Sequence, residues 1–109
     1  MKKQTNYVKG RNFEYRVMKY LKDRGFFCMR AYGSKGMYDI LAIQPFVDFG
    51  WYNYSLLIQA KLNGYVPPKE MQTLKENEWN WQGITIIAWR DKKSRKLRFR
   101  NLEGIELVV

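Results

Sequence analysis

Polar side chains stand at the ends of two short apolar runs in the sequence. Asp39 begins the run that ends at Ile43, and Gln59 and Lys61 close a second run that begins at Leu56. Side chains alternate along a strand, so Gln59 and Lys61 are expected on one face. A buried carboxylate needs a partner or a cation, an amide oxygen can bind a hard cation, and a lysine can stabilise charge on a phosphate. Taken singly, Asp39 is better explained as a turn residue, and the other two as a strand end that enters solvent.

Glu14 adds an acid from a predicted helix. Helical spacing places it toward the apolar stripe, where an acid needs a partner, and an ion pair is the simpler explanation, with Arg11, Lys19 or Lys22. The combination of two acids, an amide and a lysine nevertheless suits a magnesium site for phosphodiester hydrolysis. A bound cation polarises the phosphoryl oxygen, lowers the pKa of a water nucleophile and stabilises the leaving oxygen.

The chain contains no histidine and one cysteine, Cys28. The lack of histidine excludes Ser-His-Asp and Cys-His catalysis and histidine-based zinc sites, so hydrolysis would have to use carboxylates, lysine and a hard metal ion. Cys28 allows no intrachain disulfide and is predicted to be a small core residue in a protein of a reducing compartment.

The charge balance predicts a polyanionic partner. Lysine and arginine number 20 against 10 acidic residues, a formal net charge of +10 with a pI near 9.8. Such an excess indicates nucleic acid, although it could also serve only solubility. Alternation along the last predicted strand would align Lys96, Arg98 and Arg100 as a ridge that contacts phosphates. The predicted DNA-contacting residues are Lys9, Arg11, Arg30, Lys35, Lys93, Arg95, Lys96, Arg98 and Arg100.

Length and periodicity predict a single α/β domain over residues 1–109, with a mixed sheet flanked by helices. No signal peptide or membrane-spanning segment is predicted, so we expect a soluble, intracellular, cytoplasmic protein. The connection over residues 44–53 is unusually aromatic, which favours a dimer interface over contact with unpaired bases. The predicted order is α-β-β-β-α-β-β, with helices over about 7–24 and 68–81 and strands over about 26–32, 37–43, 54–61, 84–90 and 96–100.

The polar constellation resembles the PD-(D/E)XK nuclease motif, and most of the chain, about residues 9–102, resembles the archaeal Holliday junction resolvases. The segments that carry the resemblance are residues 9–16, 21–26, 30–36, 39–42 and 58–61. It implies a restriction-endonuclease-like fold and a homodimer that makes paired nicks in four-way DNA junctions with Mg²⁺, for which Mn²⁺ can substitute.

The resemblance also assigns roles to single residues. Catalytic roles fall on Glu14, Asp39, Gln59, Lys61 and Ser34, the serine of the glycine-rich loop. Asp39 and Gln59 would be metal ligands, together with the Ala60 carbonyl and Glu14. Lys61 would position the attacking water, and Lys35 would contact the cleaved strand.

Two positions depart from the family pattern. Gln59 stands where the pattern has Glu or Asp, and Tyr38 stands where proline is usual. Gln59 still offers an oxygen but removes one negative charge, so the affinity for magnesium should fall. Two alternatives to a junction-resolving enzyme therefore stay open: a nickase or repair-type nuclease with other DNA substrates, and a DNA-binding protein without catalysis.

Overall fold

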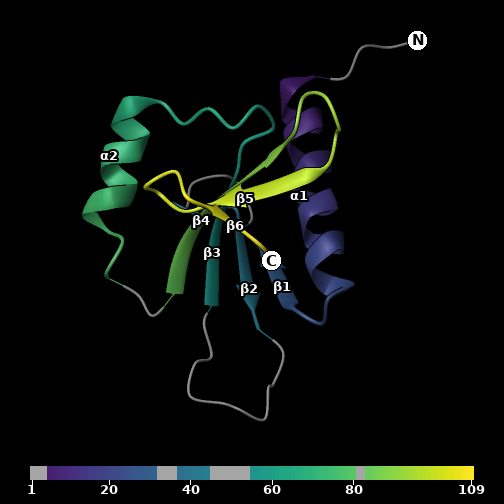
Figure 1. Cartoon of the computed structure of the whole chain (residues 1–109), viewed down its shortest axis with the longest axis horizontal. Coiled ribbons are helices and arrows are strands. Elements are labelled where there is room, and N and C mark those ends of the chain that lie inside the picture. Colours follow the sequence, from purple (N-terminus) through teal and green to yellow (C-terminus); the bar gives the residue numbers. More distant parts are fainter. Residues whose placement is uncertain (1–4, 32–36, 45–54, 81–82) are drawn as a thin grey trace.

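A computed structural model describes residues 5–31, 37–44, 55–80 and 83–109, and its strands form one six-stranded sheet with a helix on each side (Figure 1). No helix within these stretches is long and apolar enough to cross a membrane. The elements are α1 (Asn6–Lys22), β1 (Phe27–Arg30), β2 (Ile40–Ile43), β3 (Ser55–Ala60), α2 (Pro68–Glu76), β4 (Gly83–Arg90), β5 (Leu97–Arg100) and β6 (Glu106–Leu107).

The sheet is mixed, as predicted. Its strands lie in the order β1-β2-β3-β4-β5-β6, and only β3 and β4 pair in parallel, with α2 as the connection between them. The carboxyl ends of β3 and β4 therefore lie at the same end of the sheet. Strand β6 was not predicted, because its two residues are too few to show a periodic pattern; they pair with Phe99 and Arg100 of β5.

Helix α1 covers one face of the sheet. Thr5 caps it by accepting the Val8 backbone N–H at 3.2 Å, as N-terminal threonines commonly do. Its apolar stripe, with Val17 and Leu21 fully buried, packs in one core with residues of β1 to β5. Cys28 belongs to this core, as predicted, and burial raises the pKa of its thiol.

Helix α2 covers the opposite face with a smaller core. Leu74 packs there with Ile87 of β4 and with Leu102. The predicted end of this helix near residue 81 is wrong, because the helix ends at Glu76. The Asn77 backbone N–H donates to the Leu74 carbonyl at 3.3 Å, and the chain then turns.

Candidate active site

Asp39 lies directly before β2 and connects three strands. Its backbone N–H donates to the Ile58 carbonyl of β3 at 2.8 Å, and its carbonyl accepts the Ala31 N–H, directly after β1, also at 2.8 Å. Its carboxylate Oδ2 accepts the backbone N–H of Ala60 at 2.8 Å. The side chain is thus held at the carboxyl end of β3 by a backbone donor, with the other oxygen outside this contact.

The surroundings of Asp39 oppose its ionisation. Burial raises the pKa of the Asp39 carboxyl above its ordinary value, and the negative charges of Glu14 and Glu70 raise it further. The Ala60 N–H and the Lys61 ammonium act in the opposite direction without cancelling the effect of burial on the pKa. A cation beside this carboxylate would stabilise its charged form.

Gln59 is a buried polar residue, with only 6% of its surface exposed. Its amide nitrogen donates to the Met37 carbonyl, a short hydrogen bond that holds the side chain toward the segment before Asp39. The amide oxygen of Gln59 takes no part in this hydrogen bond. As predicted from strand alternation, Gln59 and Lys61 face away from the α1 core, which contains Ile58 and Ala60.

Lys61 pairs with Glu70, a residue that the sequence did not single out. The Lys61 ammonium lies 2.9 Å from Oε1 of Glu70 in the first turn of α2. About a quarter of the lysine side chain and a third of the glutamate side chain remain exposed (26% and 32%). An acid in a first helical turn is common because the helix dipole stabilises its negative charge. Sequence spacing alone therefore gave no reason to place Glu70 near Lys61.

Glu14 reaches the same end of the sheet from α1 and pairs with Arg30, the last residue of β1. The Arg30 Nε lies 2.8 Å from Glu14 Oε2, and only 14% of the glutamate and 18% of the arginine side chain are exposed. The expected alternative partners were wrong, since Lys19 pairs with Asp23 instead. A hydrogen bond from its guanidinium to Glu14 raises the pKa of Arg30, which therefore stays charged.

The structure thus brings four of the five predicted catalytic positions to one end of the sheet, where β3 finishes and β2 begins. Asp39, Gln59 and Lys61 come from two neighbouring strands, and Glu14 lies close enough to raise the pKa of Asp39. Ser34 lies outside the described residues, as do Lys35 and all of the predicted aromatic connection over residues 44–53 except Gln44.

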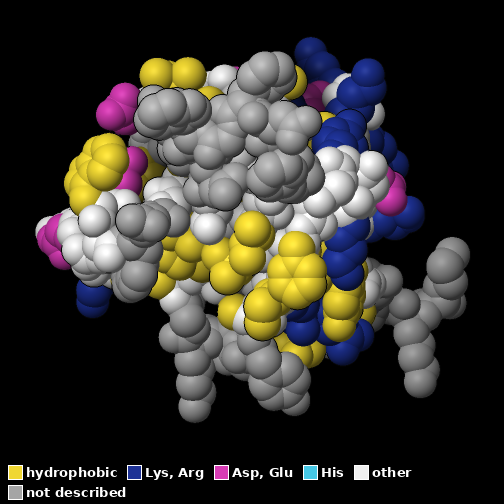
Figure 2. Space-filling view, turned by 90° about the horizontal axis from the view of Figure 1, so that it is seen from below, with side chains coloured by type: hydrophobic (Ala, Val, Ile, Leu, Met, Phe, Trp, Pro, Cys, Tyr) yellow, Lys and Arg dark blue, Asp and Glu magenta, His cyan; other side chains and the backbone are white. Residues whose placement is uncertain are grey.

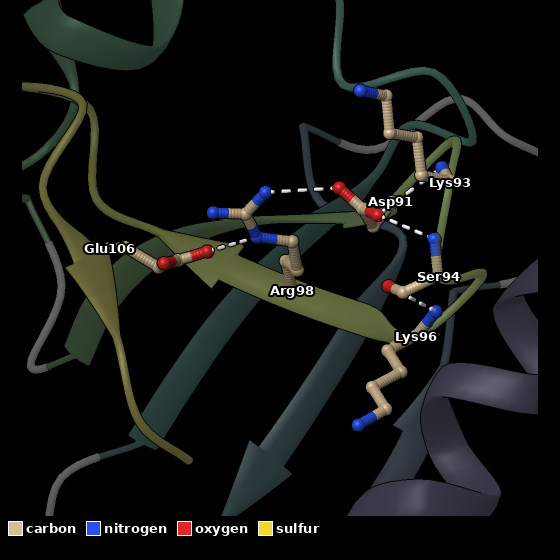
Figure 3. A network of polar contacts seen from close by, with 6 residues as sticks. All are labelled: Asp91, Lys93, Ser94, Lys96, Arg98 and Glu106. Atoms are coloured by element: carbon tan, nitrogen blue, oxygen red, sulfur yellow. Dashed lines mark hydrogen bonds and ion pairs between the residues drawn. The ribbon is translucent and has the colours of Figure 1, made fainter.

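The three residues of the predicted basic ridge on β5 differ in their contacts. Arg98 lies between two acids, with Nη1 3.1 Å from Asp91 Oδ1 and Nε in a short contact with Glu106 (Figure 3). Arg100 donates instead to the backbone carbonyls of Gly64 and Asn101. Lys96 precedes β5 and points away from the Arg98 cluster (Figure 3). Arg98 is therefore neutralised where a phosphate contact was expected.

The turn before β5 is rigidly built around Asp91. Its carboxylate accepts the Ser94 backbone N–H at 2.7 Å and the Lys93 backbone N–H at 3.2 Å (Figure 3). The Ser94 backbone N–H above all, together with the Ser94 side chain and Arg98, lowers the pKa of Asp91 to about 2. The side chains of Lys93, Arg95 and Lys96 remain exposed around this turn, so contact with DNA stays a prediction for them.

Comparison with known proteins points to one family. The family model described as archaeal Holliday junction resolvase (Hjc) matches residues 5–107. A search of curated proteins gives no match. Among solved structures, the Holliday junction resolvase Hjc of Archaeoglobus fulgidus superposes with a TM-score of 0.63 and 22% identity, covering 87% of this chain and 74% of that one. A bacterial homing endonuclease, I-Ssp6803I, superposes with a TM-score of 0.54 and 7% identity, covering 97% of this chain and 80% of that one. At these identities the superpositions establish the restriction-endonuclease-like fold.

Proposed function

The chain belongs to the archaeal Holliday junction resolvase family, and on this premise we propose that it is a metal-dependent endonuclease that cuts four-way DNA junctions. The observation that carries the proposal is the Asp39 carboxylate, which the Ala60 N–H holds at the carboxyl end of β3 beside Gln59 and Lys61. Burial, and after it the charges of Glu14 and Glu70, raises the pKa of this carboxyl, and a bound cation would stabilise its charged form.

The donor atoms at this edge fit Mg²⁺ or Mn²⁺ in kind. Both ions prefer oxygen ligands, and Asp39, the Gln59 amide and the Ala60 carbonyl offer only oxygens. Among the described residues, no three acidic or cysteine side chains gather as a metal site. Asp39 would therefore be the main charged ligand, with Glu14 near it but paired to Arg30. When bound, the ion would supply the Lewis acid that polarises the phosphodiester and acidifies a water.

The remaining residues would position the substrate. Lys61 would hold the attacking water or a phosphate oxygen with its ammonium, and Glu70 would hold that ammonium near the carboxyl end of β3. Gln59 would present its amide oxygen to the site, because the nitrogen is held by Met37. Glu14 would act from α1, and Ser34 from the glycine-rich loop.

We also propose that two copies act together and make paired nicks. Phe27 and Met29 of β1 and Ile43 of β2 are exposed, and Phe27 and Ile43 are direct partners across the two strands. Figure 2 shows hydrophobic side chains gathered at the surface when the molecule is seen from below. Exposed apolar patches commonly mark protein contacts, which supports a homodimer.

The direct test is cleavage of a labelled four-way junction beside its matched linear duplex, with Mg²⁺, Mn²⁺ or EDTA. We expect paired nicks in the junction only, lost with EDTA. Asp39→Asn should abolish cleavage and leave junction binding intact. Asp23→Asn, which removes the same charge from an exposed pair on α1, serves as the matched control. Full cleavage by Asp39→Asn would refute the site.

The same assay separates the two alternatives. Equal cleavage of flaps, nicked duplex and junctions would favour a nickase or repair-type nuclease. Junction binding that neither metal converts to cleavage would favour a binding protein whose site is weakened at Gln59.

Gln59→Glu tests the role of this position as a ligand. The variant restores the acid of the family pattern, and a second carboxylate should lower the Mg²⁺ concentration needed for half-maximal cleavage. An unchanged metal requirement in Gln59→Glu would argue against Gln59 as a metal ligand.

A further inference from the structure

A basic cleft lies beside the candidate active site, between the first half of α1 and the carboxyl ends of β3 and β4. It has a volume of about 320 Å³. The residues that line it are Lys9, Asn12, Phe13, Arg16, Leu62 and Arg90. Only Lys9 among them is one of the predicted DNA-contacting residues.

The lining is cationic without compensation. Lys9, Arg16 and Arg90 face one concave space, and none of the described residues that line it is an acid. None of the ion pairs between described residues includes these three cations. Arg98 differs, because two carboxylates hold it. Like charges around one cleft repel one another, so an anion bound there would remove that repulsion.

Contacts within the protein also hold the lining of the cleft in place. The Arg16 guanidinium donates to the Arg95 carbonyl at 2.6 Å, which fixes its side chain between α1 and the turn before β5. Phe13, which is almost fully buried, and Leu62 provide an apolar wall. Asn12 adds an amide that can donate to an oxygen. A wall of this kind, with a few converging polar groups, is typical of binding sites.

The cleft lies at the same end of the sheet as the candidate active site, on the α1 side. Phe13 directly precedes Glu14 on α1, and Leu62 directly follows Lys61 after β3. The Arg90 backbone N–H donates to the Leu62 carbonyl at 3.2 Å, which ties the end of β4 to the same edge. A DNA strand that passes Asp39 and Lys61 and then follows this end of the sheet toward α1 would bring a neighbouring phosphate to the cleft.

We propose that this cleft binds one backbone phosphate of the DNA strand whose phosphodiester lies at the candidate active site. Arg16, Arg90 and Lys9 supply the charge, and Asn12 donates to a phosphate oxygen. The contact positions the strand and carries no sequence information. The identity of the neighbouring phosphodiester as the one that is cut rests on the proposed function, whereas the phosphate contact itself does not.

The first test measures junction binding in EDTA, so that no cleavage occurs, over a series of KCl concentrations. Each lost phosphate contact lowers the slope of log K against log salt by about 0.9, which corresponds to about eightfold weaker binding at 0.1 M salt. We expect this change for Arg90→Gln, and also for Lys9→Gln, whose exposed side chain makes misfolding no concern. Lys75→Gln, at an exposed position in the last turn of α2, is the matched control and should keep the wild-type slope.

The second test locates the phosphate. Junctions with a single neutral methylphosphonate are made at each of several positions around the cut or, where there is no cut, around the crossover. In the wild-type protein one position should weaken binding by a similar factor, and at that position Arg90→Gln should bind the neutral and charged junctions equally. The proposal would be overturned if Arg90→Gln and Lys9→Gln had the same slope as Lys75→Gln. It would also be overturned if the loss of binding caused by the methylphosphonate and the loss caused by Arg90→Gln were additive at every position.

The two proposals fail separately. Wild-type protein that binds but never cleaves, while Arg90→Gln shows the reduced slope, would leave the cleft in place and reject the nuclease. Normal junction cleavage with an unchanged slope in both cleft variants would reject the cleft and leave the nuclease in place.

Discussion

The Glu14–Arg30 ion pair should contribute measurably to stability, and Glu14→Gln tests this. Exposed ion pairs contribute about 0.2–1 kcal/mol, whereas removing one partner of a fully buried pair costs about 3–5 kcal/mol. With less than a fifth of each side chain exposed and 2.8 Å between Nε and Oε2, this pair lies between the two cases. We expect Glu14→Gln to lower the free energy of unfolding by about 2 kcal/mol, or the melting temperature by roughly 10 °C.

The assay is a double-mutant cycle by urea unfolding, with Glu14→Gln, Arg30→Gln and the double variant. Each single variant leaves one charge poorly solvated, while the double variant leaves none. The double variant should therefore recover most of the loss, with a coupling energy of about 2 kcal/mol. Asp23→Asn, which breaks the exposed Lys19–Asp23 pair, should cost less than about 1 kcal/mol. A coupling energy near zero would refute the reasoning from burial.

The same variants separate a structural role of Glu14 from a catalytic one. If Glu14 acts in the active site, cleavage should be lost in Glu14→Gln and stay lost in the more stable double variant. Recovery of cleavage together with stability would show that Glu14 only holds Arg30.

Two further predictions concern charge. In metal-free buffer, the raised pKa of Asp39 means that the folded protein binds this proton more tightly than the unfolded chain does. Its contribution to stability is therefore present below about pH 4 and lost as pH rises through the raised pKa. Asp39→Asn, which can still accept the Ala60 N–H, should be more stable than wild type at neutral pH, with a difference in unfolding free energy that shrinks as pH falls; a difference independent of pH would contradict this. For DNA binding, Arg98→Gln should leave the salt slope unchanged because two carboxylates already hold Arg98, whereas Lys96→Gln should lower it by about 0.9; equal effects of the two in titrations with a junction would contradict this.

The sequence predicted the main elements because the core imposes regular patterns. The stripe of α1 and the apolar runs of β2, β3 and β4 follow from burial on one or both faces. The prediction failed where no such pattern exists. Trp79 extended the apparent pattern of α2, yet its side chain is 88% exposed and lies beyond the end of the helix. Strand β6 has two residues, too few to show a periodic pattern, and it forms by pairing with β5.

The candidate site was predictable to the extent that it follows strand alternation. Gln59 and Lys61 emerge together for that reason, and Asp39 could be recognised at the head of an apolar run. The partners of the charged residues could not be predicted, because they come from other elements. Arg30 reaches Glu14 from β1, and Glu70 reaches Lys61 from α2.

These pairings determine how strongly the site attracts a cation. Glu14 and Glu70 each raise the pKa of Asp39 through their charges, and in this group of three acids the two glutamates are each matched by one basic partner. Asp39 belongs to no ion pair among the described residues. The three acids and their two basic partners therefore retain a formal charge of about −1, and the neutral Gln59 adds nothing to it. A cation bound there would meet one uncompensated charge rather than two. Weak metal binding, strengthened by the phosphate of a bound DNA strand, is therefore the expected behaviour, and metal affinity should rise when DNA is present.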